Sequence, residues 1–433
     1  NAIGVRLVGS EMCIRDRYRL RMVAKEFKDS IAHEMFAATP PVEALRMIVS
    51  WAASWSNQDE EQRAVMACDI SRAFFHAEAG EDMFVELPEE DQVPGRDLVG
   101  KLRLALYGTR EAAAAWQKEV CKHLTQIGFV KGMFNPCLFQ HPERQIRVMV
   151  HGDDYAAAGP RSQLNWMSQE LERRLGTDYV KTDMLSSHAE DAQEITILNR
   201  ILRMTKEGIE MEADVRHAEI IVKELVQGQH KHVVTPGLDY EGAVDEYPEL
   251  SAEYAQAFRR LVARANYISI DRPDIAFAVK ELCRRMSKPT ERDWSHLLRL
   301  GKFLSVRRRA VQSFTWQYES NDMKVYADSN FAGCKLTRKS TSGGCVMIGN
   351  HYIRGWSKTQ AVISLSSGEA ELAGIVKGTC EAIGAKSIGK DLGRDLEGVV
   401  FTDSSAALSM TGRVGAGKIR HLDTIMLWVQ HKQ

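Results

Sequence analysis

The sequence lacks the patterns that indicate a zinc site, a disulfide framework, a membrane span or a secretory signal. Its 8 cysteines are scattered, without a Cys-x-x-Cys pair or a Cys/His array, and this spacing excludes the first two. No apolar run approaches the length that a bilayer requires, and nothing resembles a signal peptide. We therefore expect a reducing, cytoplasmic location and no membrane partner.

The charge balance also gives no overall attraction to nucleic acid. The net charge is −1, so a polyanionic partner would have to be held by local basic patches or through metal ions. Three stretches could form such patches, residues 19–28, 284–288 and 307–309. Each could equally be a solvated helix face. With 433 residues, 44% of them hydrophobic, the chain is expected to form two or three domains.

Residues 147–159 form an apolar run that is interrupted by Gly152-Asp153-Asp154. The pattern predicts a hairpin, because Gly152 can take the positive φ of a tight turn. Adjacent aspartates at a turn repel each other unless a cation such as Mg²⁺ lies between them. A solvated turn is the alternative interpretation. Asp69, at the end of the buried strand predicted for residues 64–70, favours the metal site.

Three more acids lie at the ends of predicted strands or in the first turns of a predicted helix near the C-terminus. Asp328 and Asp403 end strands predicted for residues 325–328 and 399–403, and Glu371 lies in a helix that opens at Ser366. Ser366 and Glu369 have capping-box spacing, which assigns Glu369 to the first amides of its own helix. Glu371 is therefore preferred as the metal-site acid, with Glu369 as the alternative.

Periodicity predicts the other elements. Strands are expected at residues 21–25, 82–87, 345–348 and 362–365, and helices at 41–55, 105–124, 161–176, 215–226, 251–270, 273–287 and 291–305. Residues 71–79 are expected to form a turn or short helix, in which Phe75 is a core aromatic. Ser404 or Ser405 is placed to cap a final helix.

Seven stretches, taken in order, resemble the reverse transcriptase and RNase H portion of a copia-type LTR retrotransposon Pol polyprotein, from Tyr18 to the end. They are residues 69–75, 106–116, 152–154, 272–279, 327–328 with 340–344, 365–371 and 402–403. Their joint occurrence in family order is a much stronger signal than any single motif.

The resemblance implies an α+β fold, namely a right-hand polymerase with fingers, palm and thumb followed by an RNase H-like mixed α/β domain. Residues 18–235 would be fingers and palm, 236–321 a linker and helical thumb or connection, and 322–433 the RNase H-like domain. Residues 1–17 resemble a translated library-adapter sequence and are expected to be foreign. The last domain is expected to be truncated before its fourth acid, and the chain to be an internal piece of a longer polyprotein.

The same resemblance implies the site residues. The palm triad would be Asp69, Asp153 and Asp154, and the RNase H acids would be Asp328, Glu371 and Asp403. Each set would hold two Mg²⁺ ions, with Mn²⁺ as a substitute. The residues implied to contact the nucleotide are Arg21, Lys25, Ala73, Phe74 and Gly108.

The implied activities are RNA-directed DNA synthesis by nucleotidyl transfer and degradation of the RNA strand in RNA/DNA hybrids. The implied partners are an RNA template, a DNA primer, the hybrid, dNTPs and other segments of the polyprotein. The implied location is a cytoplasmic virus-like particle with a nuclear stage. Ser340-Thr341-Ser342 could touch the hybrid backbone or form a hydroxyl-rich turn.

The chain departs from the family pattern at several positions. His151-Gly152 precedes the paired aspartates where an aromatic and an aliphatic residue are usual, and Glu111 replaces a glutamine. Ala113-Ala114 replaces a Pro-Arg pair, and Asn199 replaces a glycine beside the primer grip. The substitutions around Glu111 and His151 favour an alternative hypothesis, a decayed or co-opted copy that binds nucleic acid without catalysis.

Overall fold

The structure of the chain is a computed structural model, and it divides into two units that are described separately. The described residues are 4–7, 11–13, 17–19, 22–26, 37–57, 59–80, 83–87, 91–96, 98–226, 228, 231–238, 247–415, 417, 421 and 424–432. Unit 1 comprises Asn1–Ile48, Asp59–Asp191 and Lys390–Gly393, and unit 2 comprises Val49–Gln58, Ala192–Gly389 and Arg394–Gln433. The domain limits predicted at residues 235 and 321 both fall inside unit 2, and they stay predictions.

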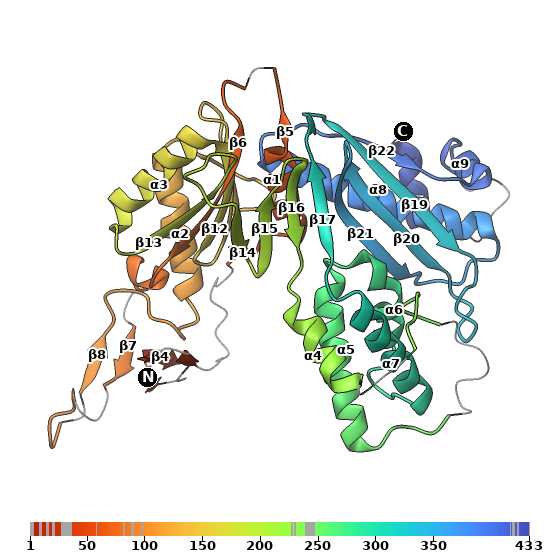
Figure 1. The fold of residues 1–433 in the computed structure, drawn as a ribbon, viewed down its shortest axis with the longest axis horizontal. Helices are drawn as coiled ribbons and strands as arrows, with labels where there is room; N and C mark the ends of the chain where they lie inside the picture. The colour runs from red at the N-terminus through yellow and green to blue at the C-terminus, as the bar shows by residue number, and fades with distance from the viewer. Residues whose placement is uncertain are drawn as a thin grey trace. The chain divides into compact units, whose positions relative to one another are not determined.

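Unit 1 is built on an antiparallel sheet of six strands in the order β13-β6-β12-β11-β10-β9 (Figure 1). In chain order the strands are β6 (Arg63–Ile70), β9 (Val130–Lys131), β10 (Leu138–His141), β11 (Ile146–His151), β12 (Asp154–Pro160) and β13 (Val180–Leu185). The predicted strand at 64–70 is therefore confirmed. It lies between β12 and β13, and most of its side chains are buried.

The predicted hairpin is also confirmed, because β11 and β12 pair directly with His151 opposite Asp154. Gly152 has a φ of 66°, a left-handed conformation that glycine adopts without strain. A positive φ at the first turn residue is typical of the two-residue turns that match the twist of paired strands. Gly152 and Asp153 thus form the tip.

Two helices, α2 (Ala112–Gln126) and α3 (Arg161–Leu175), pack on this sheet and share its apolar core. The helix predicted from residue 105 begins only at Ala112, and this prediction was wrong by two turns. Gly108 explains the difference: its φ is 89°, and a Cβ there would lie 2.0 Å from the carbonyl oxygen of Ala24. The chain must turn at Gly108 so that Tyr107 can accept a hydrogen bond from the Ala24 amide at 2.7 Å.

Shorter elements complete unit 1. They are β1 (Gly4–Leu7), β2 (Glu11–Cys13), β3 (Arg17–Arg19), β4 (Met22–Lys25), the 3₁₀ helix η1 (Ala73–His76), β7 (Phe84–Glu86) and β8 (Val99–Lys101). β1 pairs with β4, β2 with β3, and β7 with β8. β1 and β2 lie within the segment 1–17, whose foreign origin stays a prediction. The helix α1 (Val42–Ala52) runs across the boundary between the units and is shorter than the predicted 41–55, because Ser54–Trp55 form the strand β5.

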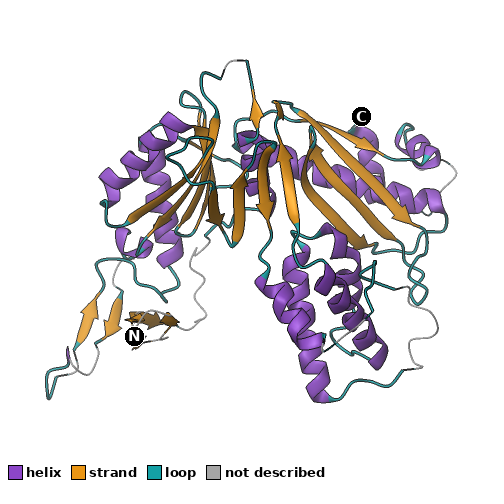
Figure 2. Cartoon of the chain, in the orientation of Figure 1, coloured by secondary structure: helices purple, strands orange, loops and turns teal. Residues whose placement is uncertain are grey.

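Unit 2 contains a group of helices beside a small antiparallel sheet (Figure 2). The helices are α4 (Arg216–Leu225), α5 (Ala252–Ser269), α6 (Pro273–Cys283) and α7 (Glu291–Val306). The strands, in sheet order, are β14 (Glu194–Ile197), β15 (Arg200–Met204), β16 (Gly208–Glu212) and β17 (Val311–Thr315). All four helices were predicted, and their apolar faces form one core. Caps at Ser251 and Thr290 and a proline in the first turn of α6 start three of them.

A second sheet in unit 2 has the order β21-β20-β19-β22, in which β19 and β22 are parallel. Its elements are β19 (Asp322–Asn330), β20 (Thr341–Ile348), β21 (His351–Thr359), α8 (Ser367–Asp391), β22 (Glu397–Phe401), α9 (Ser405–Thr411) and the 3₁₀ helix η4 (Thr424–His431). α8 packs closely on the sheet, since a Cβ at Gly378 would lie 3.2 Å from the Cβ of Ala327. A short parallel pair, β5 with β18 (Gln317–Tyr318), completes the unit.

Two apolar predictions were wrong. Residues 362–365 form no strand but a connection before α8, in which Val362, Ile363 and Leu365 are exposed. The β-branched run has strand propensity, but propensity supplies no partner for a hydrogen-bonded ladder. Phe75 is 37% exposed and not a core residue, because η1 directs it to the edge of Tyr107.

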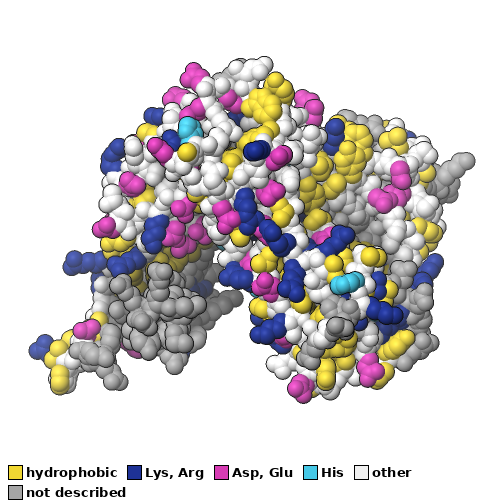
Figure 3. All heavy atoms as spheres, in the orientation of Figure 1, with side chains coloured by type: hydrophobic (Ala, Val, Ile, Leu, Met, Phe, Trp, Pro, Cys, Tyr) yellow, Lys and Arg dark blue, Asp and Glu magenta, His cyan; other side chains and the backbone are white. Residues whose placement is uncertain are grey.

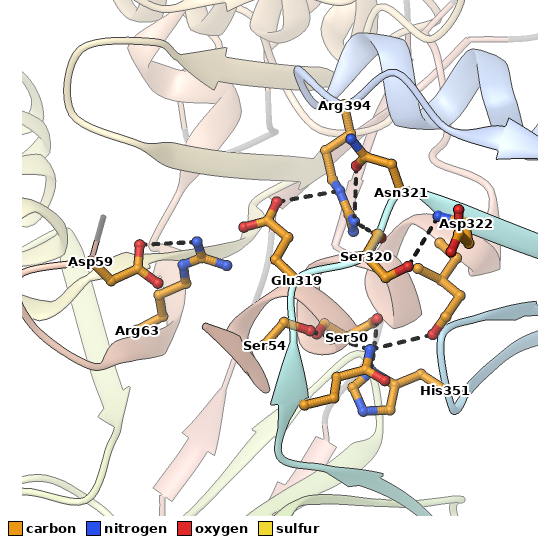
Figure 4. Close-up of polar contacts among 12 residues, drawn as sticks. Ser50, Ser54, Asp59, Arg63, Glu319, Ser320, Asn321, Asp322, His351 and Arg394 are labelled. Atoms are coloured by element: carbon orange, nitrogen blue, oxygen red, sulfur yellow. Dashed lines mark hydrogen bonds and ion pairs between the residues drawn. The ribbon is translucent and has the colours of Figure 1, made fainter. Parts of the chain in front are cut away.

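A buried histidine joins the end of α1 to β17 and β21 within unit 2 (Figure 4). His351 is fully buried, and its Nε2 lies 2.7 Å from the carbonyl oxygen of Thr315. A carbonyl can only accept, so Nε2 carries the proton and Nδ1 accepts. Ser50 Oγ at 2.9 Å and Gln317 Nε2 at 3.1 Å lie on Nδ1. Burial lowers the pKa of His351, which keeps the ring neutral.

This network predicts a pH-dependent stability. His351→Gln should lower the free energy of unfolding by roughly 1–3 kcal/mol at pH 8, because buried groups lose their partner. The folded-state pKa is depressed, so the contribution of His351 is complete above the unfolded-state pKa of about 6.5 and is lost as the pH falls. Urea denaturation should therefore show a deficit that shrinks toward pH 5.5. A matched control is Ser54→Ala, whose deficit should not follow this trend; a pH-independent deficit for His351→Gln would contradict the prediction.

Candidate functional site

The first group of predicted acids lies at one end of the unit 1 sheet. Asp69 on β6 is the direct cross-strand partner of Asp154 on β12. The amide of Ile70 donates to the carbonyl oxygen of Asp153 at 3.0 Å, which ties the hairpin tip to the end of β6. Asp69 and Asp153 are exposed and Asp154 is half-buried. Asp69 and the Asp153-Asp154 pair, which are distant in sequence, are therefore neighbours in the sheet.

The electrostatics of this group are those of crowded carboxylates. Burial raises the pKa of Asp154, and the charges of Asp153 and Asp69 raise it further. Cys68, the neighbour of Asp69, is a buried thiol whose pKa is raised to about 12, mainly by burial. A thiol in that state is a poor nucleophile and a poor metal ligand. The acids are thus the reactive groups at this end of the sheet.

A tryptophan on α2 is hydrogen-bonded to the hairpin tip. The Nε1 of Trp116 donates to the carbonyl oxygen of Gly152 at 2.7 Å, and the ring is 3% exposed. Helical periodicity predicted a helix around Trp116 but carried no signal for its indole hydrogen bond. A cavity of about 170 Å³ beside the tip is lined by residues that include Phe74, Trp116, His151 and Gly152.

The residues predicted to contact the nucleotide have different surroundings. Phe74 is half-buried, and its ring lies 4.5 Å from that of Tyr107. Lys25 is exposed on β4, whereas Ala73 is fully buried in the core. On the side where Gly108 lacks a Cβ, the neighbour is the Ala24 backbone. Arg21 lies outside the described residues, and the nucleotide contacts of all five residues stay predictions.

The second group of acids converges more tightly. One oxygen of each of Asp328, Glu371 and Asp403 lies within 4.8 Å of the others, and in the part of the chain that the structure describes no other three potential ligands do so. Asp328 is on β19, and Asp403 follows β22, its parallel neighbour. Parallel strands end at the same edge of a sheet. Glu371 reaches that edge from the start of α8.

Hydrogen bonding leaves one oxygen of this group without a partner. The amide of Ser329 donates to Oδ1 of Asp328 at 2.8 Å and to Oε1 of Glu371 at 3.2 Å. Oε2 of Glu371 is buried and accepts no hydrogen bond. Burial raises the pKa of Glu371, and Asp328 and Asp403 add to the effect. Three clustered carboxylates, one of which has a buried oxygen without a hydrogen-bond partner, fit a hard divalent cation.

Glu369, the alternative to Glu371, has another role. Its Oε2 accepts from the amide of Leu365 at 2.9 Å, and its Oε1 lies 3.2 Å from the hydroxyl of Ser366. Its own amide donates to that hydroxyl at 3.3 Å, as in a capping box, while its carboxylate accepts from the Leu365 amide, one residue before the Ser366 cap. His421 also lies 3.1 Å from Oε2. Glu369 is therefore a helix cap, and the assignment of metal binding to Glu371 stays a prediction.

The hydroxyl-rich stretch 340–342 is used within the fold. Ser340, Thr341 and Ser342 are buried at the start of β20. Ser340 Oγ accepts from the amide of Ala332 at 3.0 Å, and Lys280 donates to Thr341 Oγ1 at 2.9 Å. These contacts favour a packing role over contact with a hybrid backbone.

The basic patches are largely compensated by acids. Arg309 pairs with Glu212, and Arg284 pairs with Glu281. In the patch at 19–28, residues 20, 21, 27 and 28 lie outside the described residues. Figure 3 shows Lys and Arg side chains gathered over β15 and β16, near the end of β16 that leads to α4, with acidic side chains between them. Among the described helices, none has the length and apolar character that crossing a bilayer requires.

Comparison with known proteins gives a consistent result. Residues 2–183 match the family model described as reverse transcriptase (RNA-dependent DNA polymerase). The chain is 24% identical over 443 residues to the retrovirus-related Pol polyprotein from transposon TNT 1-94 of Nicotiana tabacum, an alignment that covers 96% of the chain and 31% of that protein. It is 25% identical over 410 residues to that from transposon RE1 of Arabidopsis thaliana, covering 90% of the chain and 26% of the relative.

A further relative is the secreted RxLR effector protein 161 of Plasmopara viticola. It is 31% identical over 114 residues, which cover 26% of the chain and 80% of that protein. The chain spans less than a third of the length of the two Pol polyproteins. The chain is therefore similar over most of its own length to retrovirus-related Pol polyproteins from plant transposons, and its residues 2–183 match the reverse transcriptase model.

Proposed function

We propose that the chain is an RNA-directed DNA polymerase in which Asp69, Asp153 and Asp154 are the catalytic acids. The observation that carries this proposal is the direct pairing of Asp69 with Asp154 beside the hairpin tip. In this proposal the six-stranded sheet is the palm, the strands before it belong to the fingers, and α5–α7 form the thumb or connection. The match of residues 2–183 to the reverse transcriptase model supports it.

The roles of the residues follow from their chemistry. The three carboxylates would hold two Mg²⁺ ions, or Mn²⁺ in their place, and their crowding disfavours the site without a cation. The bound ions supply activation of the primer hydroxyl and compensation of the charge on the reacting phosphate. Phe74 would lie under the sugar of the incoming dNTP and exclude a 2′-hydroxyl. Arg21 and Lys25 would bind its triphosphate.

For residues 322–433 we propose an RNase H-like activity on the RNA strand of RNA/DNA hybrids. The convergence of Asp328, Glu371 and Asp403 supports it, because the same ligand set can activate water in place of a primer hydroxyl. The parallel strands β19 and β22 supply two of the acids from one sheet edge. The alternative hypothesis, nucleic acid binding without catalysis, is distinguished by the assays below.

The further partners are proposals as well. The polymerase would take an RNA template, a DNA primer and dNTPs, and the second site would take the hybrid that synthesis produces. The relatives are named Pol polyproteins, and the aligned parts cover 31% and 26% of their lengths. Other segments of such a polyprotein are therefore proposed partners, within a cytoplasmic virus-like particle that has a nuclear stage.

The two activities should separate by mutation. Asp153→Asn should reduce Mg²⁺-dependent dNTP incorporation on a primed RNA template by about 100-fold or more, because it removes a charged ligand. It should leave cleavage of a preformed RNA/DNA hybrid unchanged, and Asp403→Asn should do the reverse. Asp183→Asn, on the neighbouring strand β13, is the control for the first variant.

Full incorporation by Asp153→Asn would remove the palm assignment. Hybrid binding with neither synthesis nor cleavage, in Mg²⁺ or Mn²⁺, would select the alternative hypothesis of a non-catalytic copy.

Phe74 should determine the choice between deoxynucleotides and ribonucleotides. Phe74→Ala should raise rNTP incorporation relative to dNTP incorporation by roughly 10-fold or more, because the space for a 2′-hydroxyl opens. Single-nucleotide extension with each substrate gives the ratio of kcat/KM values. Phe75→Ala is the matched control, since Phe75 is the exposed neighbour. An unchanged ratio in Phe74→Ala would reduce Phe74 to a core residue.

The second acid group should lower stability in the absence of metal. Glu371→Gln should raise the thermal midpoint in EDTA, because it relieves repulsion at a group whose pKa is raised. The gain in the free energy of unfolding should be less than about 1 kcal/mol, since solvent screens the charges. It should also reduce the stabilisation that Mg²⁺ gives the wild-type chain. Glu369→Ala should instead cost about 1 kcal/mol through loss of the cap. A lower midpoint for Glu371→Gln in EDTA would contradict this account.

A further inference from the structure

A buried amide lies directly behind the second acid group. Gln360 follows β21 and is 8% exposed. Its Nε2 lies 2.8 Å from the carbonyl oxygen of Ala370, 3.0 Å from Ser342 Oγ and 3.2 Å from Ser329 Oγ, so its two protons are shared among three acceptors. Its Oε1 accepts from Ser364 Oγ at 3.1 Å. One side chain thereby connects β19, β20, the connection before α8 and α8 itself.

The orientation of this amide is determined by its surroundings. The carbonyl oxygen of Ala370 can only accept, so the amide nitrogen of Gln360 must face it. The oxygen of Gln360 is then left for Ser364, whose hydroxyl can donate. A buried amide with every group partnered rigidifies its site, whereas a partly satisfied one costs stability.

The partners of Gln360 are the residues next to the acids. Ser329 directly follows Asp328, and Ala370 directly precedes Glu371. Ser329 Oγ donates to the carbonyl oxygen of Ala370 at 2.8 Å, and its amide donates to both Asp328 and Glu371. The backbone amide of Ser329 is therefore the hydrogen-bond donor that Asp328 and Glu371 share.

The acids need such support because they repel each other. Asp328, Glu371 and Asp403 have ligand oxygens within 4.8 Å, and like charges at that distance move apart unless the backbone is held. The amide of Ser329 is a fixed dipole directed at two of them. Its direction depends on the contacts of its own side chain with Ala370 and Gln360.

We propose that Gln360 is a positioning residue for the second acid group: it holds Ser329 against Ala370 so that Asp328 and Glu371 present their oxygens to one divalent cation. The proposal rests on the metal-binding role of this group in the proposed function. Outer residues that orient metal ligands typically contribute about 10–100-fold to metal affinity.

The test compares two glutamines of the same unit. Gln360→Leu keeps the approximate volume and removes all four hydrogen bonds. The matched control is Gln317→Leu, because Gln317 donates to the carbonyl oxygen of Ile348 at 3.3 Å and accepts from the amide of Asn350 at 2.9 Å. Ile348 pairs with Met323, at the opposite end of β19 from Asp328. Both variants lose a hydrogen-bonded amide, buried at Gln360 and half-buried at Gln317, but only Gln360 lies behind the acids.

The measurement is Mn²⁺ binding to the full chain, followed by electron paramagnetic resonance of the free ion. An Asp153→Asn, Asp154→Asn background removes ligands of the first group. In that background Gln360→Leu should weaken Mn²⁺ binding by about 10-fold or more, and Gln317→Leu should leave it within about 2-fold of the parent. Circular dichroism at the titration temperature verifies that both variants are folded.

Each outcome decides the proposal. Unchanged affinity in Gln360→Leu overturns the positioning role and leaves the metal site intact. If Asp403→Asn does not weaken Mn²⁺ binding, the second acid group is not a metal site. The metal site of the proposed function and the positioning role of Gln360 are then both wrong. If Gln360→Leu fails to fold, Ser329→Ala replaces it, since that variant keeps the amide and removes the hydroxyl between Gln360 and Ala370. It should weaken Mn²⁺ binding by about 3-fold or more, and parental affinity would overturn the proposal.

Discussion

The repulsion between clustered carboxylates is the constraint on which the rest of both sites depends. Asp69, Asp153 and Asp154 come together at one sheet end, and Asp328, Glu371 and Asp403 at another. No described arginine or lysine forms an ion pair with an acid of either cluster, although Lys181 is a cross-strand neighbour of Asp69. Burial adds to the repulsion at Asp154 and Glu371. Such an arrangement lowers the stability of the metal-free chain, so its geometry must be fixed by the surrounding backbone.

The two groups meet this constraint differently. In the second, the Ser329 amide donates to two carboxylates at once, so their oxygens are already close without a cation. In the first, the hydrogen bond from Ile70 to the Asp153 carbonyl and that from Trp116 to the Gly152 carbonyl fix the backbone of the tip. No described donor binds two of its side chains together. Hydrogen bonds thus fix the backbone of the first group, whereas in the second group they fix the carboxylate oxygens themselves.

Sequence patterns predicted those parts of the fold that depend on local chemistry. The hairpin at Gly152, the buried strand before Asp69, the capping box at Glu369 and the helices α4–α7 all follow from turn, cap and periodicity rules. The errors arose where a tertiary contact decides. Gly108 ends a helical pattern because Ala24 lies against it, and residues 362–365 have strand propensity without a strand to pair with. The contacts of Trp116 and Gln360 had no sequence signal, since they join residues distant in the chain.

Asn199 shows how a departure from a family pattern can keep the backbone. It stands where the family has a glycine, and its φ of 62° lies in the left-handed region. Asparagine tolerates that conformation better than other residues with a side chain, and its Oδ1 accepts from Arg216 at 3.1 Å. The turn between β14 and β15 therefore has a left-handed backbone of the kind that glycine adopts without strain. A substitution of this kind is weak support for decay, because asparagine can adopt the backbone conformation that glycine adopts at such a turn. The loss of positive charge at Ala113-Ala114 has no comparable compensation among the described contacts. The case for a non-catalytic copy thus depends on the second kind of change and not on the first.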